Sequence, residues 1–452
     1  MAKLFGTDGI RGLVNDKNIN SKMGFKIGRA LAEYRGKINN HPKIIIARDT
    51  RGSGPELEAA LSAGIAAGGG EVILAGIIPT PGLAFLIKEE KADAGVVISA
   101  SHNDHTYNGF KIFKSDGTKL NDSEEAELEE IILKDMAEIN SEKDFPGQPE
   151  ELFYREENLL NKYASFLLSA LPPELNFNGV KIILDCSHGA TYEIAPRIFK
   201  KLGAEVESIS IEPNGKNINE NCGSQHTGAL CRAVRDKAAD LGLAFDGDGD
   251  RLIAVTGDGE VLTGDHLLYI YSRLFLERGW LENNLVVSTV MSNIGFINAL
   301  RALGAAHKAA DVGDRAVFFE MDKSGAVLGG EESGHIIFSK FHTTGDGILS
   351  ALMLVWAMKH YRESLSELSA RLTLAPKLLL NVEVKQKPEL SSVPEIREII
   401  KEAENYFGEA GRVLVRYSGT EPLCRVMIEG RNEEEVRNLA EKISEVIKNK
   451  LN

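Results

Sequence analysis

Cysteine is scarce in this chain: the 452 residues include four cysteines, and none of them forms a C-x-x-C pair. Unpaired cysteines of this kind are typical of reduced thiols in a cytosolic protein. Long apolar runs are also lacking, since the longest, near Ala351–Met358, falls well short of the ~20 residues that a membrane-spanning helix needs. The first residues lack the basic and apolar regions of a signal peptide. We therefore expect a cytoplasmic protein that does not enter a membrane.

Positive charge is in the minority. Lysine and arginine total 52 against 66 aspartates and glutamates, which gives a net charge of −14. A nucleic acid needs a basic face, so this balance argues against nucleic acid as a partner, but it permits a small anionic substrate in a local basic pocket. Three common motifs are missing as well, namely G-x-x-x-x-G-K-[ST], H-E-x-x-H and G-x-G-x-x-G. Their absence argues against P-loop ATPases, zincins and dinucleotide enzymes.

Glycine, in contrast, is abundant, with 44 residues and no Gly-X-Y period. This surplus predicts many loops that need unusual backbone geometry or a close approach to a ligand. Apolar residues make up 43% of the chain and charged residues 26%, a balance that excludes wholesale disorder. The length predicts roughly three domains of about 150 residues each.

Three segments of the chain repeat one plan: a strand, a turn, a helix, a glycine and a second strand. They run over Lys43–Gly76, Lys181–Ile211 and Leu285–Val312. Near-continuous apolar strands joined through helices are typical of parallel sheets. The repeats therefore predict three similar α/β domains with mixed sheets.

Each repeat continues into another apolar strand that ends in a polar loop. The loops are Ser101–Asn103, Asp246–Arg251 and Gly329–His335. Ligands of open α/β sheets bind beyond the carboxyl ends of the strands. Three equivalent positions therefore carry loops with chemically active side chains, and we expect them to form the functional site.

The domain boundaries are expected near residues 150, 255 and 370, which gives domains of residues 1–150, 151–255, 256–370 and 371–452. They follow a polar stretch at Phe145–Glu150, a tight turn at Thr256–Glu260 and a helical stretch at Leu349–Leu372. The last domain has alternating apolar residues at Leu378–Val384 and closes on an amphipathic helix, which predicts a small α+β domain. The apolar face of that helix comprises Val436, Leu439, Ile443, Val446 and Ile447.

The sequence DGDGDR carries the strongest local signal. Asp246, Asp248 and Asp250 alternate with glycines, so that their carboxylates gather on one side and repel one another unless a hard cation binds them. A calcium EF-hand would need glycine and glutamate where Arg251 and Gly257 stand. We therefore favour a Mg²⁺ site over a solvated acidic turn.

Two other loops present groups that suit a phosphorylated sugar. Glu331 and Ser333 stand on a glycine-rich loop and can bind sugar hydroxyls. In RYSGTEPLCR, two arginines, two hydroxyls and a glycine-flanked backbone match what a phosphate dianion needs. These residues are Arg416, Ser418, Gly419, Thr420 and Arg425.

Two smaller signals concern Ser101 and Arg11. The tripeptide Ser101-His102-Asn103 is a weak signal alone, and a serine helix cap would explain it, but it stands shortly before Lys111. Arg11 lies between glycines in FGTDGIRG, which favours contact with an anion over a surface salt bridge.

Taken in order, FGTDGIRG, SASHN with NGFK, DGDGDR, GGEESGH and RYSGTEPLCR resemble the motifs of the α-D-phosphohexomutase superfamily. The finer pattern resembles the branch that acts on glucosamine phosphates, on the strength of NENCGSQH, DVGDR and HIIFSKFHTTGDGI. One departure is Asp104, which stands where the family usually has proline after SHN. It leaves the rigidity of that loop in doubt.

The resemblance implies four domains around a central cleft and a mutase that moves a phosphoryl group between two ends of one sugar. Ser101 would carry the phosphoryl group and, with the three aspartates, bind Mg²⁺. Arg11 and Lys111 would flank the reacting group, with Lys111 transferring protons. Glucosamine 1,6-bisphosphate or glucose 1,6-bisphosphate would be the activator, and a homodimer is the family expectation. The resemblance also assigns His102 and Arg251 to catalysis and His335 to substrate binding.

Three alternatives stay open on the sequence. The substrate could be a glucose or mannose phosphate, as in phosphoglucomutases and phosphomannomutases. A metal-dependent sugar phosphatase would use Ser101 and the aspartates but would have less need for RYSGTEPLCR. A sugar-phosphate sensor would have no need to keep both Ser101 and the aspartates.

Overall fold

The computed structural model describes residues 4–6, 8–138, 153–155, 158–418 and 422–452. The chain divides into two compact units, each with a core of its own. The larger unit comprises Met1–Val290 and Lys308–Ser369, and the smaller unit comprises Met291–His307 and Ala370–Asn452.

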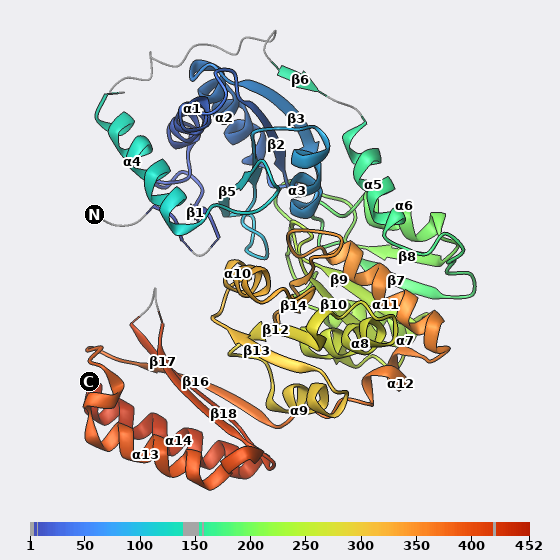
Figure 1. The fold of residues 1–452 in the computed structure, drawn as a ribbon, viewed down its shortest axis with the longest axis vertical. Coiled ribbons are helices and arrows are strands. Elements are labelled where there is room, and N and C mark those ends of the chain that lie inside the picture. Colours follow the sequence, from blue (N-terminus) through green and yellow to red (C-terminus); the bar gives the residue numbers. More distant parts are fainter. Residues whose placement is uncertain (1–3, 7, 139–152, 156–157, 419–421) are drawn as a thin grey trace. The chain divides into compact units, whose positions relative to one another are not determined.

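The first sheet of the larger unit has six strands in the order β1-β5-β4-β2-β3-β6 (Figure 1). The pairs β2–β3, β2–β4 and β3–β6 are parallel, whereas β5 is antiparallel to β1 and β4. Ile44 and Ile46 of β2 pack into one core, and Ile45 and Ala47 pack into another, because alternate residues of a strand point to opposite faces. The strands are β1 (Ile10–Leu13), β2 (Lys43–Arg48), β3 (Glu71–Ile77), β4 (Ala94–Ile98), β5 (Tyr107–Lys114) and β6 (Phe153–Arg155), and the helices are α1 (Ser21–Gly36), α2 (Gly54–Ala67), α3 (Thr80–Glu89) and α4 (Asp122–Glu138).

Helices α1 and α2 cross very closely, and two glycines permit it. A Cβ atom on Gly64 would overlap the carbonyl oxygen of Phe25, and one on Gly28 would overlap that of Leu61. Part of the glycine surplus therefore serves helix packing rather than loops.

The second sheet has the order β11-β10-β9-β7-β8. β7 is parallel to β8 and β9, while β10 is antiparallel to β9 and β11. The aspartate loop connects β9 to β10, so it lies at the carboxyl end of β9. The elements are α5 (Leu159–Ser169), β7 (Lys181–Asp185), α6 (Ile194–Lys201), β8 (Glu205–Ile209), α7 (Gly228–Asp236), β9 (Leu241–Phe245), β10 (Leu252–Thr256) and β11 (Val261–Leu262).

The third sheet has the order β13-β12-β14-β15, with β12 and β14 parallel and β15 antiparallel to β14. The loop that carries Glu331 connects β14 to β15. One long helix was expected at Leu349–Leu372, but the structure has two, because Arg362 adopts a left-handed conformation with φ of 56° and ends the first. The elements are α8 (Gly264–Glu277), η3 (Glu282–Asn284), β12 (Leu285–Thr289), β13 (Ala306–Ala310), α10 (Asp314–Ser324), β14 (Leu328–Gly330), β15 (Ile336–Phe338), α11 (Gly347–Tyr361) and α12 (Leu365–Ser369).

The smaller unit contains an antiparallel sheet in the order β16-β18-β17, with helices α13 and α14 packed on it (Figure 1). The predicted apolar face of the last helix is confirmed: Val436, Ile443 and Ile447 are buried, and the other two residues pack against the same core. The elements are α9 (Ile294–Ala302), β16 (Lys377–Glu383), η4 (Leu390–Ser392), α13 (Pro394–Phe407), η5 (Gly408–Ala410), β17 (Arg412–Tyr417), β18 (Leu423–Glu429) and α14 (Glu433–Leu451).

The predicted fold class is confirmed: three mixed α/β sheets are followed by a small antiparallel sheet with helices. The tight turn expected at Thr256–Glu260 connects the antiparallel strands β10 and β11. The boundary expected near residue 150 lies outside the described residues, and the boundaries near 255 and 370 stay predictions. In the part of the chain that the structure describes, no helix is both long and apolar enough to cross a membrane.

Candidate active site

Ser101 and the aspartate loop meet beyond the ends of two strands, β4 and β9. The Oγ of Ser101 donates a hydrogen bond of 2.7 Å to Oδ2 of Asp246. Both residues are buried, with 1% and 0% of their surface exposed. Two loops that the sequence singled out separately therefore share one site.

The three aspartates form a buried cluster in which their ligand oxygens lie within 4.8 Å of one another. Burial, together with the charges of Asp250 and Asp248, raises the pKa of Asp246 well above its ordinary value. The Oδ1 atoms of Asp248 and Asp250 are buried and have no hydrogen-bond partner. Three converging carboxylates, two of which have an unpaired oxygen, fit a hard divalent cation such as Mg²⁺.

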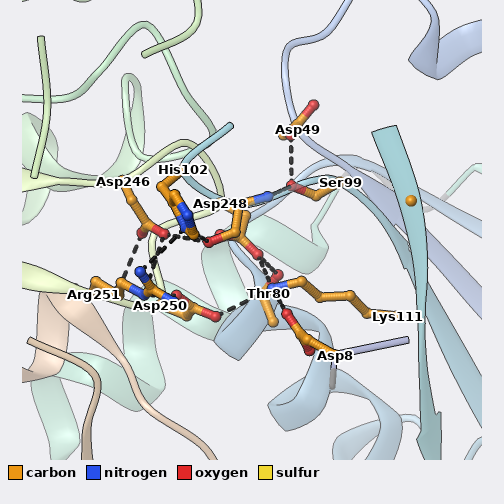
Figure 2. Close-up of polar contacts among 12 residues, drawn as sticks. Asp8, Asp49, Thr80, Ser99, His102, Lys111, Asp246, Asp248, Asp250 and Arg251 are labelled. Carbon is orange, nitrogen blue, oxygen red and sulfur yellow. Dashed lines mark hydrogen bonds and ion pairs between the residues drawn. The ribbon is translucent and has the colours of Figure 1, made fainter. Parts of the chain in front are cut away.

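Lys111 extends from β5 into this cluster, as Figure 2 shows. Its Nζ lies 2.7 Å from Asp248, 3.2 Å from Asp250 and 2.9 Å from Asp8. Burial opposes the charge of Lys111, but the carboxylates of Asp248, Asp250 and Asp8 raise its pKa well above the ordinary value. Lys111 therefore stands protonated beside the aspartates.

A row of residues with alternating charge extends from Lys111. Asp8 pairs with Lys119 as well, and Lys119 pairs in turn with Asp314 at the start of α10. His335 lies between Asp314 and Asp250, with its Nδ1 3.7 Å from Asp250 Oδ2 and its Nε2 3.9 Å from Asp314 Oδ2. Residues of three sheet domains thus contact one another through ion pairs.

Arg11 and Arg251 approach the Ser101 loop from two different parts of the chain. Arg11 of β1 donates to Asn103 Oδ1 at 3.2 Å and to Asp8 Oδ2 at 2.9 Å. Arg251 lies with its Nη1 3.1 Å from Nδ1 of His102. Burial, reinforced by Arg251 and Arg11, lowers the pKa of His102 to about 4. His102 is therefore neutral near pH 7, and the positive charge beside Ser101 comes from the arginines and Lys111.

Asp104, which departs from the family pattern, forms a turn of its own. Its Oδ1 accepts hydrogen bonds from the backbone N–H of Thr106, at 2.8 Å, and from the Thr106 hydroxyl. An aspartate that binds the backbone two residues later fixes a turn much as a proline would. The rigidity of the loop, which the sequence left in doubt, is therefore supported by this turn.

The loop between β14 and β15 brings Glu331, Ser333 and His335 to the edge of the third sheet. Glu331 Oε1 accepts from the backbone N–H of Gly313 at 3.1 Å, and the buried Oγ of Ser333 has no hydrogen-bond partner. The backbone N–H of Gly345 donates to Nε2 of His335 at 3.0 Å, which leaves Nδ1–H directed toward Asp250.

The predicted phosphate loop belongs to the smaller unit. Arg416 and Arg425 are direct partners in the antiparallel pair β17–β18, so their side chains lie on the same face of the sheet. Ser418 follows β17, is 4% exposed and donates its backbone N–H to Leu423. Gly419 and Thr420 lie outside the described residues.

Several residues of the site were missed on the sequence. Asp8, Asn219 and Asp314 lie inside motifs that had been singled out, so those motifs carried the signal. Thr80, whose Oγ1 donates to Asp248 at 2.5 Å, and Lys119 lie in no such motif. Only the fold brings Thr80 to Asp248 and Lys119 to Asp8.

Comparison with known families accounts for nearly the whole chain. Four models described as phosphoglucomutase/phosphomannomutase match it in order: domain I at residues 2–138, domain II at 161–259, domain III at 263–374 and the C-terminal domain at 379–446. The chain therefore belongs to the phosphoglucomutase/phosphomannomutase family, which is the α-D-phosphohexomutase superfamily, and the expected class of isomerase is confirmed.

Individual relatives point to one branch of this family. A protein named phosphoglucosamine mutase from Syntrophus aciditrophicus is 47% identical over 452 residues, with all of both chains covered. Among solved structures, a phosphoglucomutase/phosphomannomutase family protein of Burkholderia thailandensis has a TM-score of 0.81 at 22% identity, covering 100% of this chain and 98% of its own. The N-acetylphosphoglucosamine mutase of Aspergillus fumigatus, in complex with GlcNAc-6P and magnesium, has a TM-score of 0.69 at 17% identity, covering 99% and 95%. These two likenesses concern the fold.

Proposed function

We propose that the chain is a phosphoglucosamine mutase, which interconverts glucosamine 6-phosphate and glucosamine 1-phosphate. The reaction passes through a phosphorylated Ser101 and a 1,6-bisphosphate, and its product would feed the synthesis of UDP-N-acetylglucosamine and cell-wall precursors. The names of the full-length relatives support the substrate. The observation that carries the chemistry is the buried Ser101 hydroxyl, 2.7 Å from an aspartate of a three-carboxylate cluster.

Phosphoryl transfer depends mainly on positioning and on stabilisation of charge. A Mg²⁺ ion bound by Asp246, Asp248, Asp250 and an oxygen of phospho-Ser101 would offset the negative charge of the transferring group. The related mutase solved with magnesium supports this choice of metal. Arg11 and Arg251 add fixed positive charge beside the Ser101 loop.

The proton balance assigns a role to Lys111. When the phosphoryl group moves from Ser101 Oγ to a sugar hydroxyl, the hydroxyl loses a proton and Oγ gains one. Lys111 holds its proton strongly beside free carboxylates, and it would hold the proton less strongly once Asp248 and Asp250 bind a cation. Lys111 could then exchange protons with both oxygens.

The remaining residues would hold the sugar phosphate. Glu331, the unpaired hydroxyl of Ser333 and His335 supply hydrogen-bonding groups for sugar hydroxyls. In the smaller unit, a phosphate that does not react would be bound by Arg416, Ser418, Gly419, Thr420 and Arg425. Turning the bisphosphate around then exchanges which phosphate reaches Ser101.

Phosphorus NMR tests the reaction directly. Purified protein with glucosamine 6-phosphate, Mg²⁺ and a trace of glucose 1,6-bisphosphate should form glucosamine 1-phosphate, and the Ser101→Ala variant should not. Ser391→Ala, at an exposed serine, is the matched control and should keep the wild-type rate. Full activity of Ser101→Ala would refute the phosphoserine role.

The same assay separates the alternatives. Faster turnover of glucose 6-phosphate or mannose 6-phosphate would assign the chain to another branch of the family. Release of inorganic phosphate would indicate a phosphatase, and tight binding without turnover would indicate a sensor.

Metal removal tests the aspartate cluster. Dialysis against EDTA should abolish turnover, and Mg²⁺ should restore it. Titration calorimetry should detect Mg²⁺ binding to the wild type and much weaker binding to Asp248→Asn, because one of three carboxylate ligands is then neutral. The exposed Asp258→Asn serves as control, and equal Mg²⁺ affinity of both variants would argue against the site.

A further inference from the structure

The backbone of Ser101 lies in a conformation that only a few residues tolerate. Its φ is +51°, in the left-handed region, although the residue is not glycine. A non-glycine residue persists in this region only where its surroundings hold it there. Something in the structure must therefore fix the Ser101 loop.

Arg51, in the connection from β2 to α2, is fully buried beneath this loop. A guanidinium has five N–H donors in a planar fork, and all five of Arg51 are used. Its Nε donates to Asp49 Oδ2 at 2.8 Å, and the other four hydrogens go to carbonyl oxygens of the loop. Those acceptors are Ser101 at 3.0 Å, Asn103 at 2.8 Å, Tyr107 at 3.0 Å and Asp104.

Asp49 also holds the Ser101 loop, through the hydroxyl of Ser99. Its Oδ2 accepts from the hydroxyl of Ser99 at 2.6 Å, a contact marked in Figure 2. The Ser99 hydroxyl in turn accepts from the backbone N–H of Ser101 at 3.0 Å. Both backbone polar groups of Ser101 are therefore tied, directly or through Ser99, to the Asp49–Arg51 pair.

Asn219, from the loop that precedes α7, completes the arrangement. Its Nδ2 donates to the carbonyl oxygens of Ser101 at 2.9 Å and Asn103 at 2.8 Å, the same two oxygens that Arg51 Nη2 binds. The Ser101 loop is thus bound by the connection between β8 and α7 as well as by the segment that follows β2.

We propose that Arg51, with Asp49, is a positioning residue: it holds Ser101 in its left-handed conformation so that Oγ points to Asp246 and the metal site. This inference rests on the proposed role of Ser101 as the phosphoryl carrier. Arg51 has no contact with Asp246, Asp248 or Asp250 among its five hydrogen bonds, so it acts through the loop.

The experiment compares Arg51→Lys, Ser99→Ala and Ser99→Thr in the full chain. Lysine keeps the positive charge of Arg51 but lacks the planar set of N–H donors. Ser99→Ala removes a single hydroxyl, so it can still be tested if Arg51→Lys does not fold. Ser99→Thr restores the hydroxyl. Arg273→Lys is the control, because Arg273 of α8 pairs with Glu277 of the same helix and with Glu363 between α11 and α12.

A displaced nucleophile predicts a specific set of results. The kcat of Arg51→Lys with glucosamine 6-phosphate should fall about 100-fold, since an error of ~1 Å in placement has effects of that size, while KM changes little. Hydrogen exchange of peptides covering residues 99–108 should become faster, and other peptides should be unaffected. Ser99→Ala should change in the same direction by less, and Ser99→Thr should behave as the wild type.

Other results would overturn the inference. One such result is a wild-type kcat in both Arg51→Lys and Ser99→Ala. The other is faster hydrogen exchange that spreads over the whole domain and is equally fast in Arg273→Lys. If the wild type neither converts glucosamine 6-phosphate nor becomes phosphorylated at Ser101 by glucose 1,6-bisphosphate, the proposed function fails. Hydrogen exchange of residues 99–108 then decides by itself whether Arg51 holds the loop.

Discussion

Gly247 shows at the scale of one residue how closely the serine and aspartate loops approach each other. A Cβ atom at this position would lie 2.6 Å from the carbonyl oxygen of Ser101 and 2.8 Å from Nδ2 of Asn219. Real Cβ atoms do not come so close to backbone or amide atoms. The glycine between Asp246 and Asp248 is therefore needed for the contact between the two loops.

Gly247→Ala should consequently displace Ser101 from Asp246 and lower both activity and stability. Gly36→Ala is the matched control, because a Cβ atom there meets nothing within 4 Å and alanine favours the helix by about 0.5–1 kcal/mol. Thermal unfolding and the mutase assay measure the two effects. Wild-type activity in Gly247→Ala would contradict the packing described.

The burial of His342 makes the stability of the folded protein depend on pH in the acid range. His342 Nε2 lies 2.8 Å from the carbonyl oxygen of Pro81, its Nδ1 accepts from the backbone N–H of Thr343, and burial lowers its pKa to about 4. The folded-state pKa is thus depressed, so the unfolded chain takes up a proton first as the pH falls. The stability is present above pH ~6.5 and is lost between there and pH ~4.

His342→Gln should therefore show a smaller fall in Tm between pH 7 and pH 4 than the wild type, by the equivalent of roughly 2–3 kcal/mol. The exposed His41→Gln is the control and should follow the wild-type profile. Calorimetric scans at several pH values provide the measurement, and parallel profiles for His342→Gln and wild type would contradict the expectation.

The sequence allowed much of this site to be predicted, and the reasons differ between residues. The aspartates and Ser101 were found because their spacing and their place after a strand carry chemical meaning. Lys119 and Thr80 were not found, since a single lysine or threonine has no local pattern. Only the fold places Thr80 beside Asp248 and Lys119 beside Asp8.

At the scale of elements, periodicity predicted the repeated strands and helices well. The errors have physical causes. β6 and β11, with three and two residues, are too short to show a periodic pattern of apolar residues. The sequence of α11 is apolar throughout, so it does not indicate where the helix ends. For α14 the prediction succeeded, because the residues of its predicted apolar face are the ones that pack in the core.

Ile443→Ala in α14 should destabilise the smaller unit by about 2–5 kcal/mol, since the side chain is fully buried in that unit's core. Glu445→Ala, exposed on the same helix, should change stability by less than about 0.5 kcal/mol. Hydrogen exchange should show the loss in β16, β17 and β18 and not in β2 or β4. A uniform loss would mean that the two units unfold together.

At the scale of the whole molecule, a chain with a net charge of −14 places two lysines among carboxylates that come from different sheets. Lys111 and Lys119 alternate with Asp250, Asp8 and Asp314, and these groups come from all three sheet domains of the larger unit. The domains are therefore linked by charges as well as by apolar contacts.

Lys119→Met would leave Asp8 and Asp314 without their shared cation and should destabilise the larger unit by roughly 3 kcal/mol. The double variant with Asp314→Asn should recover part of the loss, because one unpaired charge is removed. Lys442→Met, at an exposed pair with Glu402, should have an effect near zero. Denaturant titrations provide the comparison, and an equally small effect at Lys119 would contradict the role of these partly buried pairs.

The contacts of Arg51 have one further consequence, for the peptide dipoles of the Ser101 loop. Arg51 turns the carbonyl oxygens of Ser101, Asn103 and Asp104 toward itself, and the described residues contain no cis peptide bond. In a trans peptide the N–H points opposite to the C=O, so the amide groups that follow these three carbonyls point away from the guanidinium. A buried cation thereby orients the positive ends of three peptide dipoles to the other side of the loop, where they would attract a phosphoryl group carried by the serine.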